Sequence, residues 1–266
     1  MTSVIPLLDA GSDVHVHSTF SDGASTIDEN LASAAGHGMH TLGLVDHVRR
    51  DTTWVPSFVD AVRALDGRDG VRVLCGVEAK ILDTEGVMDM PGDMPALDYV
   101  LVADHQLPRP EGPMHPADAV LALADGTLRA DEVVADLVEA TVSALACYDR
   151  VVLAHLFSIL PKCGLDEDEV PDHLVVRLGD AVRAAGAIVE VNEKWTCPSA
   201  RVARLLAERG VDITLSTDAH HEQRVGRYDY VAGVAASVVA DLAGRDGAAP
   251  RRSSGVDGAA RHPPME

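Results

Sequence analysis

The sequence is poor in aromatic side chains, which make up 3% of its 266 residues. A core of normal size must therefore consist mainly of aliphatic side chains, and the hydrophobic fraction of 47% is sufficient for one. Cations are also few, because 22 Lys and Arg stand against 42 Asp and Glu, a formal net charge of −20. Affinity for long nucleic acids comes mainly from cationic contacts with phosphates, so this balance argues against such a partner. The negative net charge is nevertheless compatible with a small anionic substrate.

Cysteine pairs and long apolar runs are missing as well. The four cysteines lie far apart without a CxxC spacing, which favours a reduced setting over a disulfide framework. No segment reaches the roughly 20 apolar residues that cross a bilayer. The N-terminus lacks the basic start and apolar run of a signal peptide. We therefore expect a cytoplasmic protein with no membrane partner, whereas its oligomeric state stays open.

Short β-branched runs alternate with Ala- and Leu-rich stretches of helical spacing. The predicted strands are SDVHVH, TLGLVDH, VRVLCGVE, DYVLVADH, RVVLAH, AIVEVNE and VDITLSTDAH. Helices are expected at residues 26–37, 57–65, 117–124, 130–146, 173–185 and 199–209, the first with a capping box of Thr26 and Glu29. This alternation predicts an α/β fold, a closed or nearly closed β/α barrel over residues 1–242. Residues 243–266, rich in Gly, Pro, Ser and Arg, are predicted to be a disordered tail.

Ionisable side chains stand at almost every predicted strand end. In DVHVHSTFSDG, residues 13–23, the side chains of Asp13, His15 and His17 share one face because they alternate along a strand. The functional residues of β/α barrels gather at the carboxyl ends of the strands. The strand-end groups are Asp13, His15, His17, Asp46, His47, Glu78, His105, His155, Asn192, Glu193, Asp218 and His220, and Asp22 lies in the loop after the first strand.

Imidazoles and carboxylates in this number predict more than one metal ion. The donor types suit Zn, Mn or Fe, and their number exceeds what one ion takes, so two or three divalent ions are expected. Paired metal ions are a recurring device for hydrolysing phosphate esters, because they depress the pKa of a bound water and stabilise charge on phosphoryl oxygens. We expect Asp13 and Asp46 to orient neighbouring histidines rather than to bind metal.

The ordered series DVHVHSTFSDG, LVDH, GVE, VADH, LAH and STDAH resembles the motifs of the PHP (polymerase and histidinol phosphatase) superfamily, from about residue 12 to about residue 235. The chain is similar to the PHP domain of bacterial family X DNA polymerases and to PHP-type histidinol-phosphate phosphatases. The resemblance implies a distorted, TIM-barrel-like (β/α)7 barrel with a trinuclear site. It implies one metal on His15, His17, Glu78 and Asp218, a second on Glu78, His105 and His155, and a third on Asp22, His47 and His220.

The predicted function is that of a metal-dependent phosphoesterase, a hydrolase that cleaves a small phosphate monoester with a metal-activated hydroxide. Glu78 and Asp218 would act through the metals, and His220, close to Asp218 in the chain, could instead protonate the leaving group. Five cations near strand ends are candidates for binding the substrate phosphate: Arg49, Arg50, Lys80, Lys194 and Arg224.

Three other functions fit parts of the pattern. A nucleotide phosphodiesterase or a 5′-3′ exonuclease of the PHP family is compatible with the SDG motif, since the charge disfavours only long polymers. A metal-dependent amidohydrolase also begins with HxH on its first barrel strand, but STDAH and the SDG loop fit PHP better. A non-catalytic, metal-stabilised structural domain would usually have lost ligands, and none is lost in this sequence.

Overall fold

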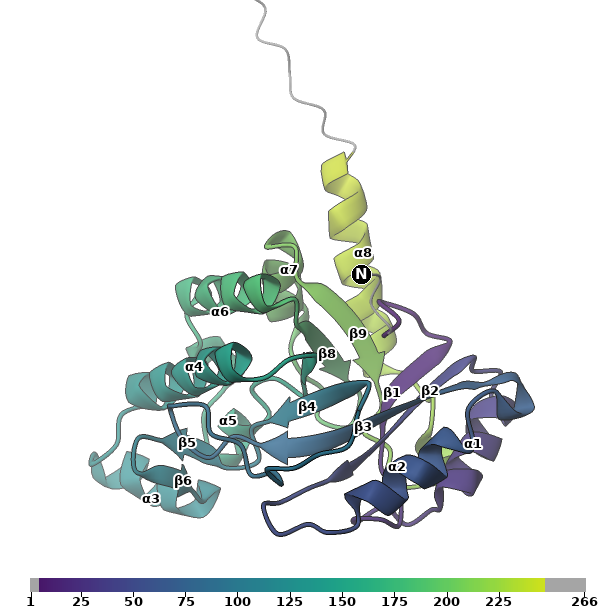
Figure 1. Ribbon diagram of the computed structural model, residues 1–266. Coiled ribbons are helices and arrows are strands. Elements are labelled where there is room, and N and C mark those ends of the chain that lie inside the picture. Colours follow the sequence, from purple (N-terminus) through teal and green to yellow (C-terminus); the bar gives the residue numbers. More distant parts are fainter. Residues whose placement is uncertain (1–4, 247–266) are drawn as a thin grey trace, which may run out of the picture.

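The centre of the molecule is a parallel sheet of seven strands (Figure 1), seen in a computed structural model that describes residues 5–246. The strands follow the order β1-β2-β3-β4-β7-β8-β9, and each neighbouring pair is parallel. Their bounds are β1 Ser12–Val16, β2 Thr41–His47, β3 Arg72–Lys80, β4 Tyr99–Ala103, β7 Val151–Leu153, β8 Ile188–Asn192 and β9 Asp212–Ser216. The predicted strands are all confirmed.

The sheet nearly closes into a barrel, and the first and last strands meet just beyond their carboxyl ends. The His17 amide donates to the Ala219 carbonyl over 2.8 Å, and the Ala219 amide donates to the His15 carbonyl over 3.3 Å. Val16 and Ala219 form an isolated parallel bridge. This closure brings the HVH motif of the first strand next to the STDAH motif of the last.

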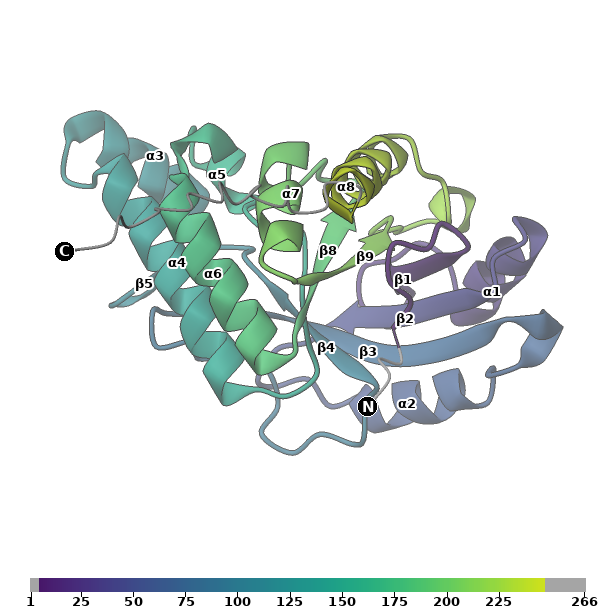
Figure 2. The ribbon, with the colours of Figure 1, turned by 90° about the horizontal axis from the view of Figure 1, so that it is seen from above.

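Helices cover the outside of the sheet. Their bounds are α1 Ile27–Gly36, α2 Val55–Arg63, α4 Ala130–Cys147, α6 Asp172–Ala185, α7 Ala200–Glu208 and α8 Tyr230–Asp246, with short 3-10 helices η1 Arg68–Gly70, η2 Glu167–Glu169 and η3 Glu222–Arg224. Figure 2 shows α4 beside α6 and α7 beside α8, pairs that are also in contact. The predicted capping box of Thr26 and Glu29 starts α1.

Helix α8 is absent from the sequence-based prediction, and it extends into the segment predicted as a disordered tail. The helix ends at Asp246, beyond the expected boundary at residue 243. Apolar side chains of α8, including Val231, Val234 and Val238, pack with Leu215 of β9, so burial against the barrel stabilises it. The rest of the predicted tail, residues 247–266, lies outside the described residues.

Between β4 and β7 the chain makes an excursion at the carboxyl-end face of the barrel. It consists of an antiparallel hairpin, β5 Leu107–Arg109 and β6 Gly112–Met114, followed by α3 Pro116–Asp125. An ion pair of 2.6 Å between Arg109 and Asp136 ties the hairpin to α4. A further short helix, α5 Ile159–Lys162, follows β7. The hairpin and the short helix α5 were not predicted, because neither segment has a periodic pattern of hydrophobic residues.

One buried cluster, formed mainly by strand residues, is aliphatic apart from one tyrosine. Val14, Val45, Leu74 and Leu101 cluster there with Tyr99. The Tyr99 hydroxyl donates a hydrogen bond of 2.6 Å to the Val14 carbonyl. In the described part of the chain, none of the helices combines the length and apolar character needed to cross a membrane.

Replacing Tyr99 with Phe is expected to lower the free energy of unfolding by about 1–3 kcal/mol, because the buried Val14 carbonyl loses its partner. Urea denaturation monitored by circular dichroism measures this change. Tyr148→Phe is the matched control, since that hydroxyl makes only a contact of 3.4 Å with the Met88 amide. Equal unfolding midpoints for the Tyr99 variant and the parent would contradict the assigned hydrogen bond.

Candidate metal centre

The first strand and the loop after it supply three of the predicted ligands, His15, His17 and Asp22. The alternation of β1 points both imidazoles inward, and both are fully buried. Gly23 lets the loop turn tightly, since a Cβ built there would lie 2.7 Å from the His17 backbone. The glycine of the SDG motif is therefore required by the close approach of two backbone segments.

Asp46 fixes the same loop from β2. Its carboxylate accepts hydrogen bonds from the amides of Ser18 and Ser21, at 3.0 and 3.2 Å. The Ser18 hydroxyl donates to the second oxygen over 2.6 Å. Asp46 thus orients the loop that carries Asp22.

The Glu78 carboxylate, on β3, lies at the centre of the cluster of predicted ligands. It is 1% exposed and each of its oxygens faces several imidazoles. Oε2 lies 3.3, 3.2 and 2.9 Å from ring nitrogens of His15, His17 and His47. Oε1 lies 3.0 and 2.9 Å from those of His105 and His155. Five imidazoles thus surround this one buried carboxylate.

Asp218 and Asp22 complete the cluster. Asp218, just after β9, has Oδ1 at 3.2 Å from both His17 Nε2 and His220 Nδ1. Asp22 lies 3.5 Å from His47 Nε2 and 3.4 Å from His220 Nε2, and it is 56% exposed. The open side of the cluster is therefore at Asp22.

The backbone is strained at two of these ligands. His155 has φ 30° and Asp218 has φ 52°, in the left-handed region that residues other than glycine seldom adopt. Such conformations persist only where the surroundings enforce them, and they concentrate at functional sites. Both residues directly follow the ends of parallel strands, where the chain turns to direct a side chain into the barrel mouth.

The charges of the cluster are strongly coupled. Burial by itself would lower the pKa of His17, but hydrogen bonds to Asp218 and Glu78 raise it to about 9. Burial would also lower the pKa of His155, but hydrogen bonds to Asp104 and Glu78 raise this pKa to about 10. Burial would raise the pKa of Glu78, yet His105 and His15 hold it well below its usual value. Without metal, the rings of His17 and His155 therefore carry protons that balance the negative charge of the neighbouring carboxylates.

The donor set fits divalent metal ions. Three overlapping groups have ligand atoms within 4.8 Å of one another, and they are His17, Asp22, His47 and His220; His15, His17 and Asp218; and His47, Glu78 and His105. His155 joins them through Glu78. Among residues 5–246, His17 Nδ1 is a buried nitrogen without a hydrogen-bond partner. All nine residues predicted as ligands thus converge on one place, and His17 and His47 each belong to two groups.

Two residues that orient imidazoles were missed in the sequence. Glu190 Oε2 lies 2.8 Å from His15 Nδ1, and its other oxygen accepts the His155 amide over 2.9 Å. Asp104 Oδ1 lies 3.3 Å from His155 Nδ1. The available signal for Glu190 was a carboxylate in the middle of the buried strand IVEVN. A buried charge of this kind needs a partner, so its position alone indicated a role.

The orienting role predicted for Asp13 and Asp46 was wrong. Within the described residues, neither carboxylate accepts a hydrogen bond from an imidazole. Asp13 accepts from the amides of Thr217 and Gly226, at 3.0 and 2.9 Å. Asp13 Oδ1 also accepts the His15 backbone amide over 3.4 Å, so its contact with His15 is to the backbone and not to the ring. Both carboxylates instead accept hydrogen bonds from backbone amides. Asp46 holds the loop after β1, and Asp13 holds the turn after β9.

Replacing Glu190 with Gln is expected to weaken metal binding by about 10- to 100-fold, because His15 loses a charged partner for its second nitrogen. Competition with a chromophoric chelator measures this affinity. Glu193→Gln is the matched control, since Glu193 accepts hydrogen bonds from the amides of Tyr230 and Val231. An unchanged affinity in the Glu190 variant would contradict the orienting role.

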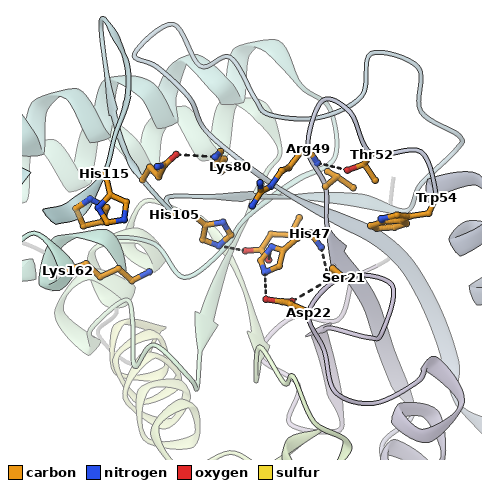
Figure 3. Close-up of a pocket in the computed structure, with 14 residues that line it drawn as sticks. Ser21, Asp22, His47, Arg49, Thr52, Trp54, Lys80, His105, His115 and Lys162 are labelled. Atoms are coloured by element: carbon orange, nitrogen blue, oxygen red, sulfur yellow. Dashed lines mark hydrogen bonds and ion pairs between the residues drawn. The ribbon is translucent and has the colours of Figure 1, made fainter. Parts of the chain in front are cut away.

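A cavity of about 810 Å³ opens over the centre (Figure 3). Arg49 and Lys80, two of the predicted substrate-binding cations, line it, together with Trp54, His115 and Lys162. The close-up shows His47, His105 and Asp22 in its middle, between Trp54 on one side and Lys162 on the other.

The other predicted cations lie differently. The Lys194 Nζ atom lies 3.1 Å from His220 Nδ1 and 3.4 Å from Asp218 Oδ1, next to the ligands. Arg50 and Arg224 are not among the residues that line the cavity. Arg50 is exposed in the turn after Arg49, where its amide donates to Asp89, and Arg224 ends η3.

The imidazoles and carboxylates cluster at the carboxyl ends of the strands, where β/α-barrel enzymes carry their active sites. Residues 13–123 match the model of the PHP domain. This match confirms, for that part of the chain, the resemblance inferred from the ordered motifs.

Relatives in other organisms have related names. A protein of Acetivibrio thermocellus named "Probable phosphatase" is 27% identical over 232 residues, covering 82% of this chain and 83% of that protein. A phosphoribosyl 1,2-cyclic phosphate 1,2-diphosphodiesterase of Eggerthella lenta is 41% identical over 73 residues, 27% of this chain and 26% of that protein. These names agree with the predicted enzyme class, a hydrolase of phosphate esters.

One solved structure shares the fold over most of its length. It is the histidinol phosphate phosphatase of Lactococcus lactis, complexed with zinc, L-histidinol and phosphate. The TM-score is 0.63 at 15% identity, and the match covers 86% of this chain and 92% of that chain. The similarity confirms the predicted TIM-barrel-like fold.

Proposed function

We propose that this chain is a metal-dependent phosphatase that hydrolyses a small phosphate monoester at a trinuclear centre. The observation that carries the proposal is the position of Glu78, whose two oxygens face imidazoles from β1, β2, β4 and β7. A buried carboxylate among so many imidazoles has the chemistry of a metal ligand, and cations bound there would balance its charge.

The residues would divide among the metals as follows. His15, His17, Glu78 and Asp218 would hold one ion, Glu78, His105 and His155 a second, and Asp22, His47 and His220 a third. Divalent ions bound there lower the pKa of water and so supply a nucleophile near neutral pH.

The protein's own side chains would bind and orient the ester. Arg49 and Lys80 line the cavity and are suited to hold phosphoryl oxygens through charge-assisted hydrogen bonds. Lys194, beside Asp218, adds positive charge where charge develops on the phosphoryl group. His220 lies next to the open side of the centre and, when not bound to metal, is positioned to give a proton to the leaving alkoxide.

The direct test is hydrolysis of p-nitrophenyl phosphate by protein loaded with Mn, Zn or Fe. We expect turnover that follows metal loading and a kcat/KM for the monoester at least about tenfold above that for bis-p-nitrophenyl phosphate. Turnover of an amide or lactone without phosphate release would instead support an amidohydrolase. No turnover of any ester by fully loaded protein would support a non-catalytic structural domain.

A phosphodiesterase is the second candidate, including one that acts on nucleotides. The Eggerthella lenta relative favours it, since its name describes cleavage of a cyclic phosphodiester and its matching segment is 41% identical. Faster turnover of the diester probe than of the monoester probe would select this candidate over the first.

Metal binding is expected to release protons at pH 7. Because the pKa of His17 is raised to about 9 and that of His155 to about 10 in the metal-free centre, both rings are protonated below those values. An incoming ion must displace the protons, so metal affinity falls as the pH is lowered. Titration calorimetry of zinc binding in buffers with different ionisation enthalpies measures the number released. A heat of binding that is independent of the buffer would contradict this charge state.

A further inference from the structure

The sequence contains only three lysines, and all three lie around the cavity of the metal centre. Lys80 and Lys162 line it, and Lys194 lies 3.1 Å from His220. The chain as a whole is strongly acidic, with a formal net charge of −20. Positive charge gathered at one cavity of an acidic protein indicates a ligand with negative charge in that cavity.

Lys162 differs from the other two lysines because, in the described part of the chain, no carboxylate lies within ion-pair distance of its ammonium. Lys80 Nζ lies 3.6 Å from Asp89, and Lys194 Nζ lies 3.4 Å from Asp218. Within residues 5–246, no ion pair of Lys162 is found; its ammonium instead lies 3.8 Å from the centroid of the Trp195 ring. Burial also lowers the pKa of Lys162. Asp104 and Asp218 act on this ammonium only from beyond ion-pair distance, so burial remains the larger effect. A bound anion in direct contact with Lys162 would offset the cost of burying its charge.

The Trp195 side chain connects Lys162 to the metal centre. Its Nε1 donates to Asp218 Oδ2 over 2.7 Å, and its ring centroid lies 5.9 Å from that of His155. Lys162 reaches the same indole from α5, so one aromatic ring separates its ammonium from two predicted metal ligands. Figure 3 shows this lysine extending from its side of the cavity towards the middle. A phosphoryl group at the metals would thus leave Lys162 facing another part of the substrate.

We propose that Lys162 binds a second anionic group, a carboxylate or a phosphate, on the alcohol part of the phosphate ester. This inference rests on the proposed function and narrows its substrate class to phosphate monoesters that carry another negative charge. Lys162 is then a specificity residue, and Trp195 packs against it to hold the ammonium towards the cavity.

Three probes that share one aromatic ring test the proposal. Phenyl phosphate has no second anion, 4-carboxyphenyl phosphate has a carboxylate, and 1,4-phenylene bisphosphate has a second phosphate. We expect metal-loaded parent protein to prefer at least one anionic probe over phenyl phosphate in kcat/KM by about tenfold or more, as a charge-assisted hydrogen bond allows. The anionic probe with the larger ratio identifies the group.

Variants of Lys162 assign the preference to that residue. Lys162→Met should bring the ratio to near one, and Lys162→Arg should keep most of the preference. Arg183→Met, on the exposed side of α6, is the control and should leave every ratio unchanged. A parent protein without preference, or a preference that survives in Lys162→Met, would overturn the inference.

Binding of non-hydrolysable probes separates this inference from the proposed function. Titration calorimetry compares benzylphosphonate with 4-carboxybenzylphosphonate and 1,4-phenylenebis(methylphosphonate) on the metal-loaded protein. Tighter binding of an anionic probe that is lost in Lys162→Met would support the second anion site even if no ester were hydrolysed, an outcome that would reject only the phosphatase. Hydrolysis of phenyl phosphate with equal affinities would keep the phosphatase and reject the site.

Discussion

Replacement of Glu78 by Gln is expected to reduce kcat/KM for p-nitrophenyl phosphate by at least about a thousandfold. The amide keeps the size of the side chain but loses the charge that two ions would share. Each Glu78 oxygen faces imidazoles that would bind different ions, so a single substitution impairs two ligand sets at once. Losing even one group that stabilises transition-state charge commonly costs about 100- to 1,000-fold, and a metal ion provides more than one such contact.

Substitution of other predicted ligands should also abolish activity, whereas substitution of a carboxylate outside the cluster should not. His17→Ala and Asp218→Ala should abolish activity with Mn or Zn, because each side chain contacts the same buried cluster. Glu139→Gln is the matched control, since Glu139 pairs with Arg177 on the exposed surface of α4 and α6. A folded Glu78→Gln protein with more than about a tenth of parental activity would contradict the bridging role.

Removal of the metals is the second change with a large expected effect. After prolonged chelation we expect activity to fall below detection and to return when Mn or Zn is added. We also expect stability to drop by about 4 kcal/mol when compared with protein at a metal concentration a thousand times the dissociation constant. For a chain of this size that corresponds to a fall in Tm of very roughly 8–16 °C.

The physical reason lies in the charge of the empty cluster. Glu78 and Asp218 have pKa values held well below their usual range by neighbouring imidazoles, so without metal they depend on protonated histidines as counter-charges. Differential scanning calorimetry with and without chelator measures the change in Tm, and p-nitrophenyl phosphate hydrolysis measures activity. A chelated, metal-free sample with parental Tm and parental turnover would contradict the assignment of these side chains to metal.

The strands and most helices were predictable because their signals are local. The β-branched runs fix β1 to β4 and β7 to β9, and the capping box of Thr26 and Glu29 fixes the start of α1. Helix α8 was missed because its apolar residues gain stability only from packing against β9. The β5–β6 hairpin was missed for a related reason, since a long-range ion pair between Arg109 and Asp136 anchors it.

The convergence of the nine predicted ligands on one place was predictable for a topological reason. Parallel strands in a barrel end on one face, so residues at their ends meet even when they are far apart in sequence. Orienting contacts do not follow from topology. Glu190 reaches His15, whereas Asp13 turns towards Thr217 and Gly226, and only side-chain geometry distinguishes the two. Lys162 was missed because α5, which carries it to the cavity, is a single short turn.

The central claim is that side chains far apart in the sequence bind a cluster of metal ions at the carboxyl-end face of the barrel. Anomalous diffraction from crystals of the purified protein, recorded on either side of the zinc, manganese and iron edges, tests it most directly. The account predicts two or three peaks among the nine ligands, with Glu78 between two of them. A protein that hydrolyses phosphate esters but shows no anomalous peak within reach of Glu78 and Asp218 would contradict it.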